Sequence, residues 1–243
     1  MKIALCSLMD DNFVIGFKVF IKSLLKHNPW FDYDYVILDN DISNESKEEM
    51  KKCYDKLIFR KIKKERYEQV DMSRTADKLK ATYYTLDVFS IAEYDRIVFM
   101  DVDMLVLDDL SEVFNCGYPF AACKAYNSGQ DITRNDINSG LFVINEKYLN
   151  KVVYNDLLRI ARRGFSMPDQ KVLNRYFVNQ IHFLNKRYNV EKRMYHTKQF
   201  KKIKDNPAVI HYVATKPWEP DKPNEIEASF TEWENLWMEY YNG

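Results

Sequence analysis

Short apolar segments that end on acidic residues recur along this chain of 243 residues, and they constrain its fold more than any other feature. The apolar runs lie at 2–8, 33–39 and 96–100, and acidic clusters occupy 10–12, 39–41 and 101–103. Segments with helical periodicity separate the runs, and strands that alternate with helices form a mainly parallel, doubly wound sheet. Ligands bind beyond the carboxyl ends of the strands in such sheets. We therefore predict an α/β fold in which the acidic clusters line one cleft.

The rest of the chain continues the same alternation. Further strands are predicted at 57–62, 119–124, 141–144 and 208–212, and helices at 13–28, 46–54, 76–91 and 169–177. Near the C-terminus four aromatic residues follow helical spacing, namely Phe230, Trp233, Trp237 and Tyr240. Such a stripe indicates packing, although a role at a membrane surface is an alternative. We predict one domain over 1–218 and a helical segment over 219–243 that packs on it.

Composition narrows the class of protein. The chain is 46% apolar and 30% charged, as is usual for a soluble globular protein. Lys plus Arg and Asp plus Glu each number 36, which argues against nucleic acid as a partner. With only 6 Gly, no glycine-rich phosphate loop is present.

The four cysteines indicate a reducing compartment, because they are scattered and form no Cys-x-x-Cys pair. No signal peptide and no apolar run of transmembrane length stand out. We expect a cytoplasmic protein without a transmembrane segment, and leave peripheral membrane contact and a homodimer open.

The Asp101-Val102-Asp103 motif has the sharpest chemical signature. Its two carboxylates interrupt the otherwise apolar run 98–106, and burying them without a partner would cost several kcal/mol. Alternate residues of an extended segment point to one side, and Asp oxygens suit Mg²⁺ or Mn²⁺. Two exposed acids that end a strand are an equally good interpretation of this motif alone.

Other polar residues have both an ordinary and a functional interpretation. His211 follows a strand and is either a satisfied core histidine or a metal ligand. Lys216 is either a surface charge or a phosphate ligand. Asn138-Ser139-Gly140 reads as a turn whose side chains can bind sugar hydroxyls. Asp169-Gln170, after Pro168, begins a helix, where an Asp is favoured without any further role.

Together, in this order, these motifs resemble glycosyltransferase family 8, the group of glycogenin and the bacterial lipopolysaccharide galactosyltransferases. The resemblance covers roughly residues 2–218 and implies a GT-A fold. It implies that Asp101, Asp103 and His211 are the metal ligands and that Lys216 binds phosphate. The implied donor-binding residues are Leu8, Asp11, Asn12, Phe13, Lys78, Asp101, Val102, Asp103, Asn138, Ser139 and Lys216, with Phe13 stacking on uracil.

The resemblance also implies the reaction, a retaining transfer of a hexose, glucose or galactose, from a UDP-sugar with Mn²⁺ or Mg²⁺. The acceptor is a glycan, a lipid-linked sugar or a protein hydroxyl. The candidate catalytic residues are Asp169, Gln170 and Lys216. Asp169 or Gln170 would be the nucleophile of a double displacement. We favour same-face attack with Gln170 as electrostatic support, since an amide is a poor nucleophile.

The chain departs from the family pattern at two places, and two other functions are alternatives to a glycosyl transfer. Val213-Ala214-Thr215 stands where the family often has a Gly, and Lys171 stands where glycogenins have Gly. A degenerate sugar-nucleotide binder would lack ligands, yet every acidic and His position is filled. A metal-dependent nucleotidyltransferase would show a glycine-rich N-terminal loop, and residues 6–13 contain no Gly.

Overall fold

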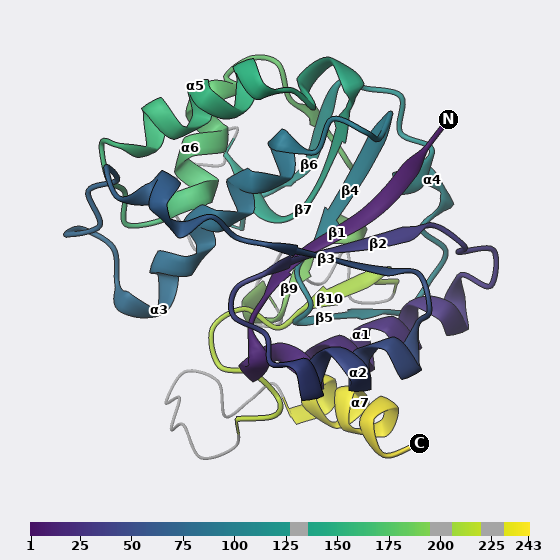
Figure 1. Ribbon diagram of the computed structural model, residues 1–243. Helices are drawn as coiled ribbons and strands as arrows, with labels where there is room; N and C mark the ends of the chain where they lie inside the picture. Colours follow the sequence, from purple (N-terminus) through teal and green to yellow (C-terminus); the bar gives the residue numbers. More distant parts are fainter. Residues whose placement is uncertain (127–135, 195–205, 220–230) are drawn as a thin grey trace.

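A computed structural model describes residues 1–126, 136–194, 206–219 and 231–243 and contains two sheets (Figure 1). The larger has seven strands in the order β3-β2-β1-β4-β7-β6-β8, and the smaller has the order β5-β10-β9. The strands are β1 Ile3–Met9, β2 Asp34–Asp39, β3 Leu57–Lys61, β4 Arg96–Met100, β5 Met104–Val106, β6 Phe120–Lys124, β7 Ile137–Asn145, β8 His182–Phe183, β9 Val190–Glu191 and β10 Val209–His211.

The large sheet is mainly parallel, as predicted. β3, β2, β1 and β4 pair in parallel, and β6 pairs in parallel with β8. Only β7 opposes its neighbours β4 and β6. The α/β architecture with a mainly parallel central sheet confirms the predicted fold class.

Helices cover both faces of the large sheet, and this explains why β4 is apolar from Ile97 to Met100. Val98 and Met100 pack in one core with α1 (Val14–His27), whereas Ile97 and Phe99 pack in a second core with α5 (Lys151–Ala161). A strand buried on both faces needs apolar side chains at every position. Figure 1 shows α1, α2 (Asn44–Cys53) and α7 (Thr231–Asn242) on one side, and α5 and α6 (Pro168–Tyr176) on the other.

Two predicted elements differ from the structure. The helix expected over 76–91 is a short α3 (Asp77–Lys80) that continues as the 3-10 helix η3 (Ala81–Ser90). Hydroxyls of Thr82 and Ser90 donate to carbonyls three residues earlier and compete with the α-helical pattern. Asn138-Ser139-Gly140 is not a turn but lies inside β7, because pairing with β4 and β6 outweighs its local turn preference.

The helix α5 and several short elements were not predicted from the sequence. The short elements include β5, β8, β9 and a helical turn α4 (Ser111–Phe114). Short 3-10 turns are η1 (Asp11–Phe13), η2 (Lys64–Tyr67), η4 (Glu146–Tyr148), η5 (Lys186–Tyr188) and η6 (Lys192–Met194).

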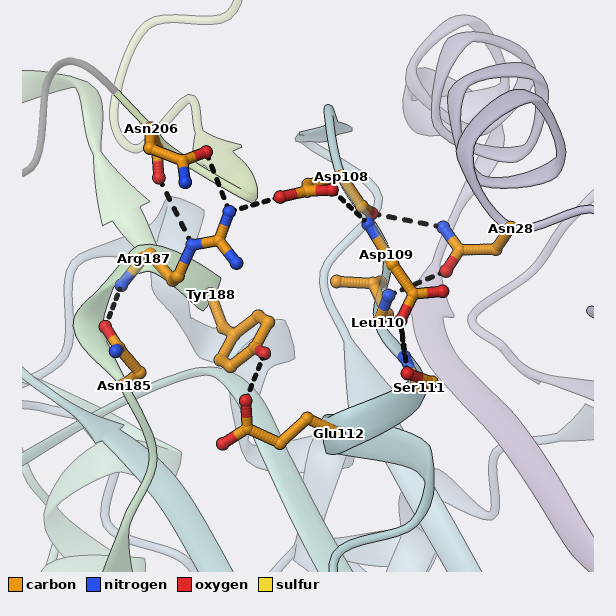
Figure 2. A network of polar contacts seen from close by, with 10 residues as sticks. All are labelled: Asn28, Asp108, Asp109, Leu110, Ser111, Glu112, Asn185, Arg187, Tyr188 and Asn206. Carbon is orange, nitrogen blue, oxygen red and sulfur yellow. Dashed lines mark hydrogen bonds and ion pairs between the residues drawn. The ribbon is translucent and has the colours of Figure 1, made fainter.

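A polar network joins the loop after β5 to η5 and to the end of α1 (Figure 2). Arg187 forms an ion pair with Asp108 and donates to Asn206 Oδ1 at 2.7 Å. Asn28 accepts from the Leu110 backbone N–H at 2.7 Å. The partly buried network holds the chain rigidly just before β9.

The C-terminal helix α7 packs near α1 through an aromatic contact. Trp237 is 1% exposed, and its ring lies 5.4 Å from the ring of Trp218. Trp218 in turn lies against Gly16 of α1. This packing accords with the predicted C-terminal helical segment, while the domain boundary at 218 stays a prediction. Phe230 lies outside the described residues.

Across the part of the chain that the structure describes, no helix has the length and apolarity needed to span a membrane.

The contact between Gly16 and Trp218 predicts a stability effect. A Cβ at Gly16 would lie 2.6 Å from Trp218 Cη2 and 3.0 Å from the Val102 carbonyl oxygen. Gly16→Ala should therefore lower the free energy of unfolding by about 1–3 kcal/mol, although alanine is the better helix former. Urea denaturation measures this change.

Gly117→Ala is the matched control, because a Cβ at Gly117 would meet no atom within 4 Å. Its effect should stay within about 0.5 kcal/mol. Equal stabilities of the two variants would contradict the packing of Trp218 on α1.

Candidate functional site

The Asp101-Val102-Asp103 motif is the crossing between the two sheets. β4 ends at Met100 and β5 begins at Met104, so three residues carry the chain from one sheet to the other. Val102 is buried in the core, which leaves its backbone as the part that can contact a donor. The two carboxylates both face His211 Nε2, although residues 102–103 form a bend and not a strand.

Antiparallel pairing of β5 with β10 brings His211 to this crossing. His211 is opposite Met104 in the register, and the Tyr212 N–H donates to the Asp103 carbonyl at 2.8 Å. His211 Nε2 lies 3.2 Å from Asp103 Oδ1 and 3.6 Å from Asp101 Oδ2. Ligand atoms of the three residues all lie within 4.8 Å of one another.

The charges and free atoms of this cluster suit a divalent cation. Asp103 Oδ1 is buried and has no hydrogen-bond partner, while Oδ2 is paired with the Lys216 ammonium. Two carboxylates and an imidazole nitrogen form a donor set that Mn²⁺-like ions accept. The residues therefore fit the metal site that the sequence predicts.

The two carboxyl groups have different affinities for protons. Burial and the charge of Asp103 raise the pKa of Asp101 to about 7, although 39% of its side chain is exposed. Burial alone would also raise the pKa of Asp103, but Lys216 and His211 hold it well below its usual range. Asp103 therefore ionises far more readily than Asp101.

His211 also binds a proton more tightly than a free histidine. Burial works against the charged imidazolium, but the ionised Asp103 beside it outweighs that effect and raises the pKa of His211. In the metal-free protein a proton on His211 thus balances the negative charge of Asp103, which a bound cation would otherwise balance.

The loop that carries Lys216 folds back over the crossing. Lys216 donates to the Tyr212 carbonyl at 3.1 Å and reaches Asp103. Ala214, within the segment where the family often has Gly, has a φ of +66°, in the left-handed region that glycine adopts without strain. The sequence departure is thus accommodated by a strained alanine, and Lys216 still reaches the cluster.

Phe13, the predicted base-stacking residue, is close to Lys216. The Lys216 ammonium lies 5.9 Å from the centre of the Phe13 ring, and Trp218 meets that ring edge-on at 6.0 Å. Phe13 is only partly buried, so a face of the ring can accept a base.

The other residues of the predicted uridine loop differ in their exposure and in their hydrogen bonds. Asp11 accepts from the Ser43 N–H at 2.9 Å, a hydrogen bond that lowers the pKa of Asp11 and joins the loops after β1 and β2. Asn12 is exposed, and Leu8 lies partly buried near the end of β1.

The predicted sugar-binding residues come together between β7 and α6. Asp169 is 8% exposed at the start of α6; burial raises its pKa, and a hydrogen bond with Ser139 opposes the rise. Its charge also helps to raise the pKa of Asp101, so the two carboxyl groups are close enough to interact. Gln170 is half-buried in the first turn of the same helix.

Lys78 is the predicted site residue that the structure does not join to the cluster. It is exposed on α3, and no hydrogen bond or ion pair to the cluster is found among the described residues.

Two hollows of about 380 and 370 Å³ lie along α6, and both are lined by Asp136, Lys171 and Asn174. Neither is lined by a candidate metal ligand.

Two groups near His211 were missed by sequence reasoning. Asn189 Oδ1 accepts from His211 Nδ1 at 2.9 Å, and Gly140 lies so close that a Cβ would be 2.4 Å from His211 Cε1. A single asparagine before two strand residues has no distinctive sequence signal. The role of Gly140 depends on β7 and β10 lying side by side.

The comparison with protein families identifies the class. The sequence pattern of "Glycosyl transferase family 8" matches residues 3–222, and the chain belongs to this family. Its fold is of the α/β GT-A type found in the solved structures that it matches, as the sequence resemblance implied.

Individual relatives support the family at low identity. Glycosyltransferase GlyF of Streptococcus pneumoniae is 28% identical over 86% of this chain and 55% of its own length. Glycogenin of Neurospora crassa is 25% identical over 87% of this chain and 30% of its own length. The chain therefore spans about half of the first relative and less than a third of the second.

Solved structures match the fold. The galactosyltransferase LgtC, in complex with donor and acceptor sugar analogs, has a TM-score of 0.75 at 20% identity, over 98% of this chain and 95% of LgtC. Glycosyltransferase GlyE of Streptococcus pneumoniae has a TM-score of 0.72 at 20% identity, over 100% of this chain and 62% of its own.

Relief of strain at Ala214 can be measured. A left-handed alanine costs about 1–2 kcal/mol. Glycine avoids this cost, but it loses about 0.5–1 kcal/mol more conformational entropy on folding than alanine does. Ala214→Gly should therefore stabilise the fold by roughly 0.5–1 kcal/mol. Ala76→Gly is the control, since Ala76 is also exposed but has a φ of −59°. Chemical denaturation that finds Ala214→Gly as destabilising as Ala76→Gly would contradict the strained loop.

Proton competition predicts how metal affinity depends on pH. Asp101, with its pKa near 7, and His211, with its raised pKa, must both lose their protons before they bind an ion. Mn²⁺ affinity should be highest above neutral pH and fall below pH 7 by about tenfold per pH unit for each proton displaced. Calorimetric titration between pH 5.5 and 8.5 measures this, and an affinity that does not change with pH would contradict it.

Proposed function

We propose that the protein transfers a hexose, glucose or galactose, from a UDP-sugar to a hydroxyl of a glycan or another acceptor with retention of configuration, in a reaction that depends on Mn²⁺, with Mg²⁺ as the alternative ion. The observation that supports this best is the cluster of Asp101, Asp103 and His211 with its unpartnered Asp103 oxygen. Family membership supports a glycosyl transfer over a nucleotidyl transfer.

The residues divide the work of donor binding. Asp101, Asp103 Oδ1 and His211 Nε2 would hold the ion, which when bound neutralises a diphosphate and makes it a better leaving group. Asp103 Oδ2 keeps the Lys216 ammonium beside the ion site, where it can bind phosphate oxygens. Phe13 offers its ring to uracil.

The buried side of the site would hold the sugar. Ser139 lies close enough to Asp169 to lower its pKa, and the charge of Asp169 in turn raises the pKa of Asp101. This proximity supports a position for the sugar next to the ion site, where one donor molecule would reach both. Lys78, exposed on α3, stays the predicted contact for the donor diphosphate.

Same-face attack is the mechanism that we propose. An amide is a poor nucleophile, and Gln170 would support positive charge at the anomeric carbon electrostatically. Asp169 is the alternative nucleophile for a double displacement. In same-face attack the leaving phosphate would take the proton of the acceptor hydroxyl.

A donor screen tests the proposal. UDP-glucose, UDP-galactose, UDP-xylose and UDP-N-acetylglucosamine are incubated with the protein, with and without Mn²⁺, and released UDP is measured. We expect release from a UDP-hexose only with the ion. Neither release nor binding of any donor would contradict the proposed function.

Asp103→Asn should reduce metal-dependent UDP release by at least about a hundredfold, because the amide cannot replace a charged ligand. Circular dichroism should show a folded protein, since the amide has the shape of the carboxylate. Asp55→Ala is the control, because Asp55 is exposed ahead of β3, and its activity should equal wild type.

A further inference from the structure

Two asparagine amides connect His211 to a backbone N–H. Gly140 N–H donates to Asn138 Oδ1 at 2.9 Å, and Asn189 Nδ2 donates to the same oxygen at 2.8 Å. Asn189 Oδ1 lies 2.9 Å from His211 Nδ1. The three side chains are buried, with exposures of 7% for Asn138, 3% for Asn189 and 4% for His211.

The direction of each bond follows from the backbone group, which can only donate. The Gly140 N–H requires the oxygen of Asn138 to face it. An oxygen that also faces Asn189 requires the NH₂ group there, so the Asn189 oxygen is turned toward His211. That oxygen can only accept, which requires a proton on Nδ1. In the neutral imidazole, the lone pair is then on Nε2.

Nε2 is the atom that faces the two carboxylates, at 3.2 Å from Asp103 and 3.6 Å from Asp101. We propose that Asn189, oriented by Asn138, is a positioning residue that keeps His211 in the tautomer with Nε2 free to bind the ion. This inference rests on the proposed metal site and adds Asn189, which touches neither ion nor donor. Hydrogen bonds of this kind commonly orient metal-bound histidines.

The surroundings hold both ends of this relay, the series of hydrogen bonds from the Gly140 N–H through Asn138 and Asn189 to His211. A Cβ at Gly140 would lie 2.8 Å from His211 Nδ1, so the ring packs directly on the β7 backbone. Asn189 follows Arg187 and Tyr188, which are held by Asp108 and Glu112 in the network of Figure 2. Its own N–H donates to the Lys186 carbonyl at 3.1 Å. The Asn189 amide therefore approaches the ring from a fixed backbone.

The relay also changes the interpretation of Asn138. The resemblance assigns its side chain to sugar binding, but its oxygen already accepts two hydrogen bonds within the protein. Only its Nδ2 group is left to donate to a sugar hydroxyl.

The tautomer is measured first, on metal-free wild-type protein with ¹⁵N-labelled histidine. The pH is raised until the ¹⁵N shifts show a neutral ring, and long-range ¹H–¹⁵N spectra then show which nitrogen carries the proton. The His211 signals are assigned by their loss in His211→Gln. We expect Nδ1–H, and a predominant Nε2–H form would overturn the proposal.

Metal affinity is measured next, by titrating Mn²⁺ alone and recording free ion by electron paramagnetic resonance. Asn189→Leu removes the acceptor at similar size and should weaken binding by about 10–100-fold. Asn189→Asp restores an acceptor for Nδ1–H and should recover most of that loss. Unchanged affinity in Asn189→Leu, or equal loss in both variants, would overturn the proposal.

Asn185→Leu is the matched control. Asn185 lies on the same segment, but its side chain accepts from the Arg187 N–H at 3.1 Å instead of reaching His211. Its Mn²⁺ affinity should equal wild type, and a loss as large as that in Asn189→Leu would overturn the proposal by showing a general effect of the segment. Wild-type protein that binds no Mn²⁺ would contradict the proposed metal site, whereas the NMR result tests the tautomer without any metal.

Discussion

The charge of the buried Asp103 carboxylate has to be balanced inside the protein, and much of the site is arranged around that requirement. Lys216 neutralises one oxygen from the loop after β10, and His211 lies beside the other. A buried carboxylate without such partners would cost several kcal/mol, and would protonate instead. The crossing from β4 to β5 places this charge where the two sheets meet. The oxygen beside His211 has no hydrogen-bond partner by geometry, and this supports the divalent cation site that we propose.

Aromatic packing gives the Lys216 loop its position. Trp218 lies between Gly16 of α1, the ring of Phe13 and Trp237 of α7. The loop that carries the phosphate-binding candidate is therefore held by the first helix and by the last one. The helices α1 and α7 thus both support the candidate site, although α7 carries no candidate site residue.

The site predicted from the sequence differs from the observed one in ways that have physical causes. Asp101 and Asp103 were found because strand alternation is a local property that two residues reveal. The composition of Asn138-Ser139-Gly140 predicts a turn. The three residues form part of β7 instead, because β7 pairs with strands that lie far away in the chain. Asn189 was missed, since its importance lies in the oxygen that it turns toward His211. Ala214 shows that a family position can tolerate another residue at the cost of backbone strain.

The sequence by itself determined the alternation of strands and helices, the mainly parallel sheet and the identity of the charged residues at the strand ends. These properties depend on hydrophobic periodicity, which is written within a few neighbouring residues. Only the tertiary structure decided that Asp103 pairs with Lys216, that β10 brings His211 to the crossing and that two asparagines define its tautomer. Such contacts join residues 20 to more than 100 positions apart, and their geometry arises when the two sheets pack together.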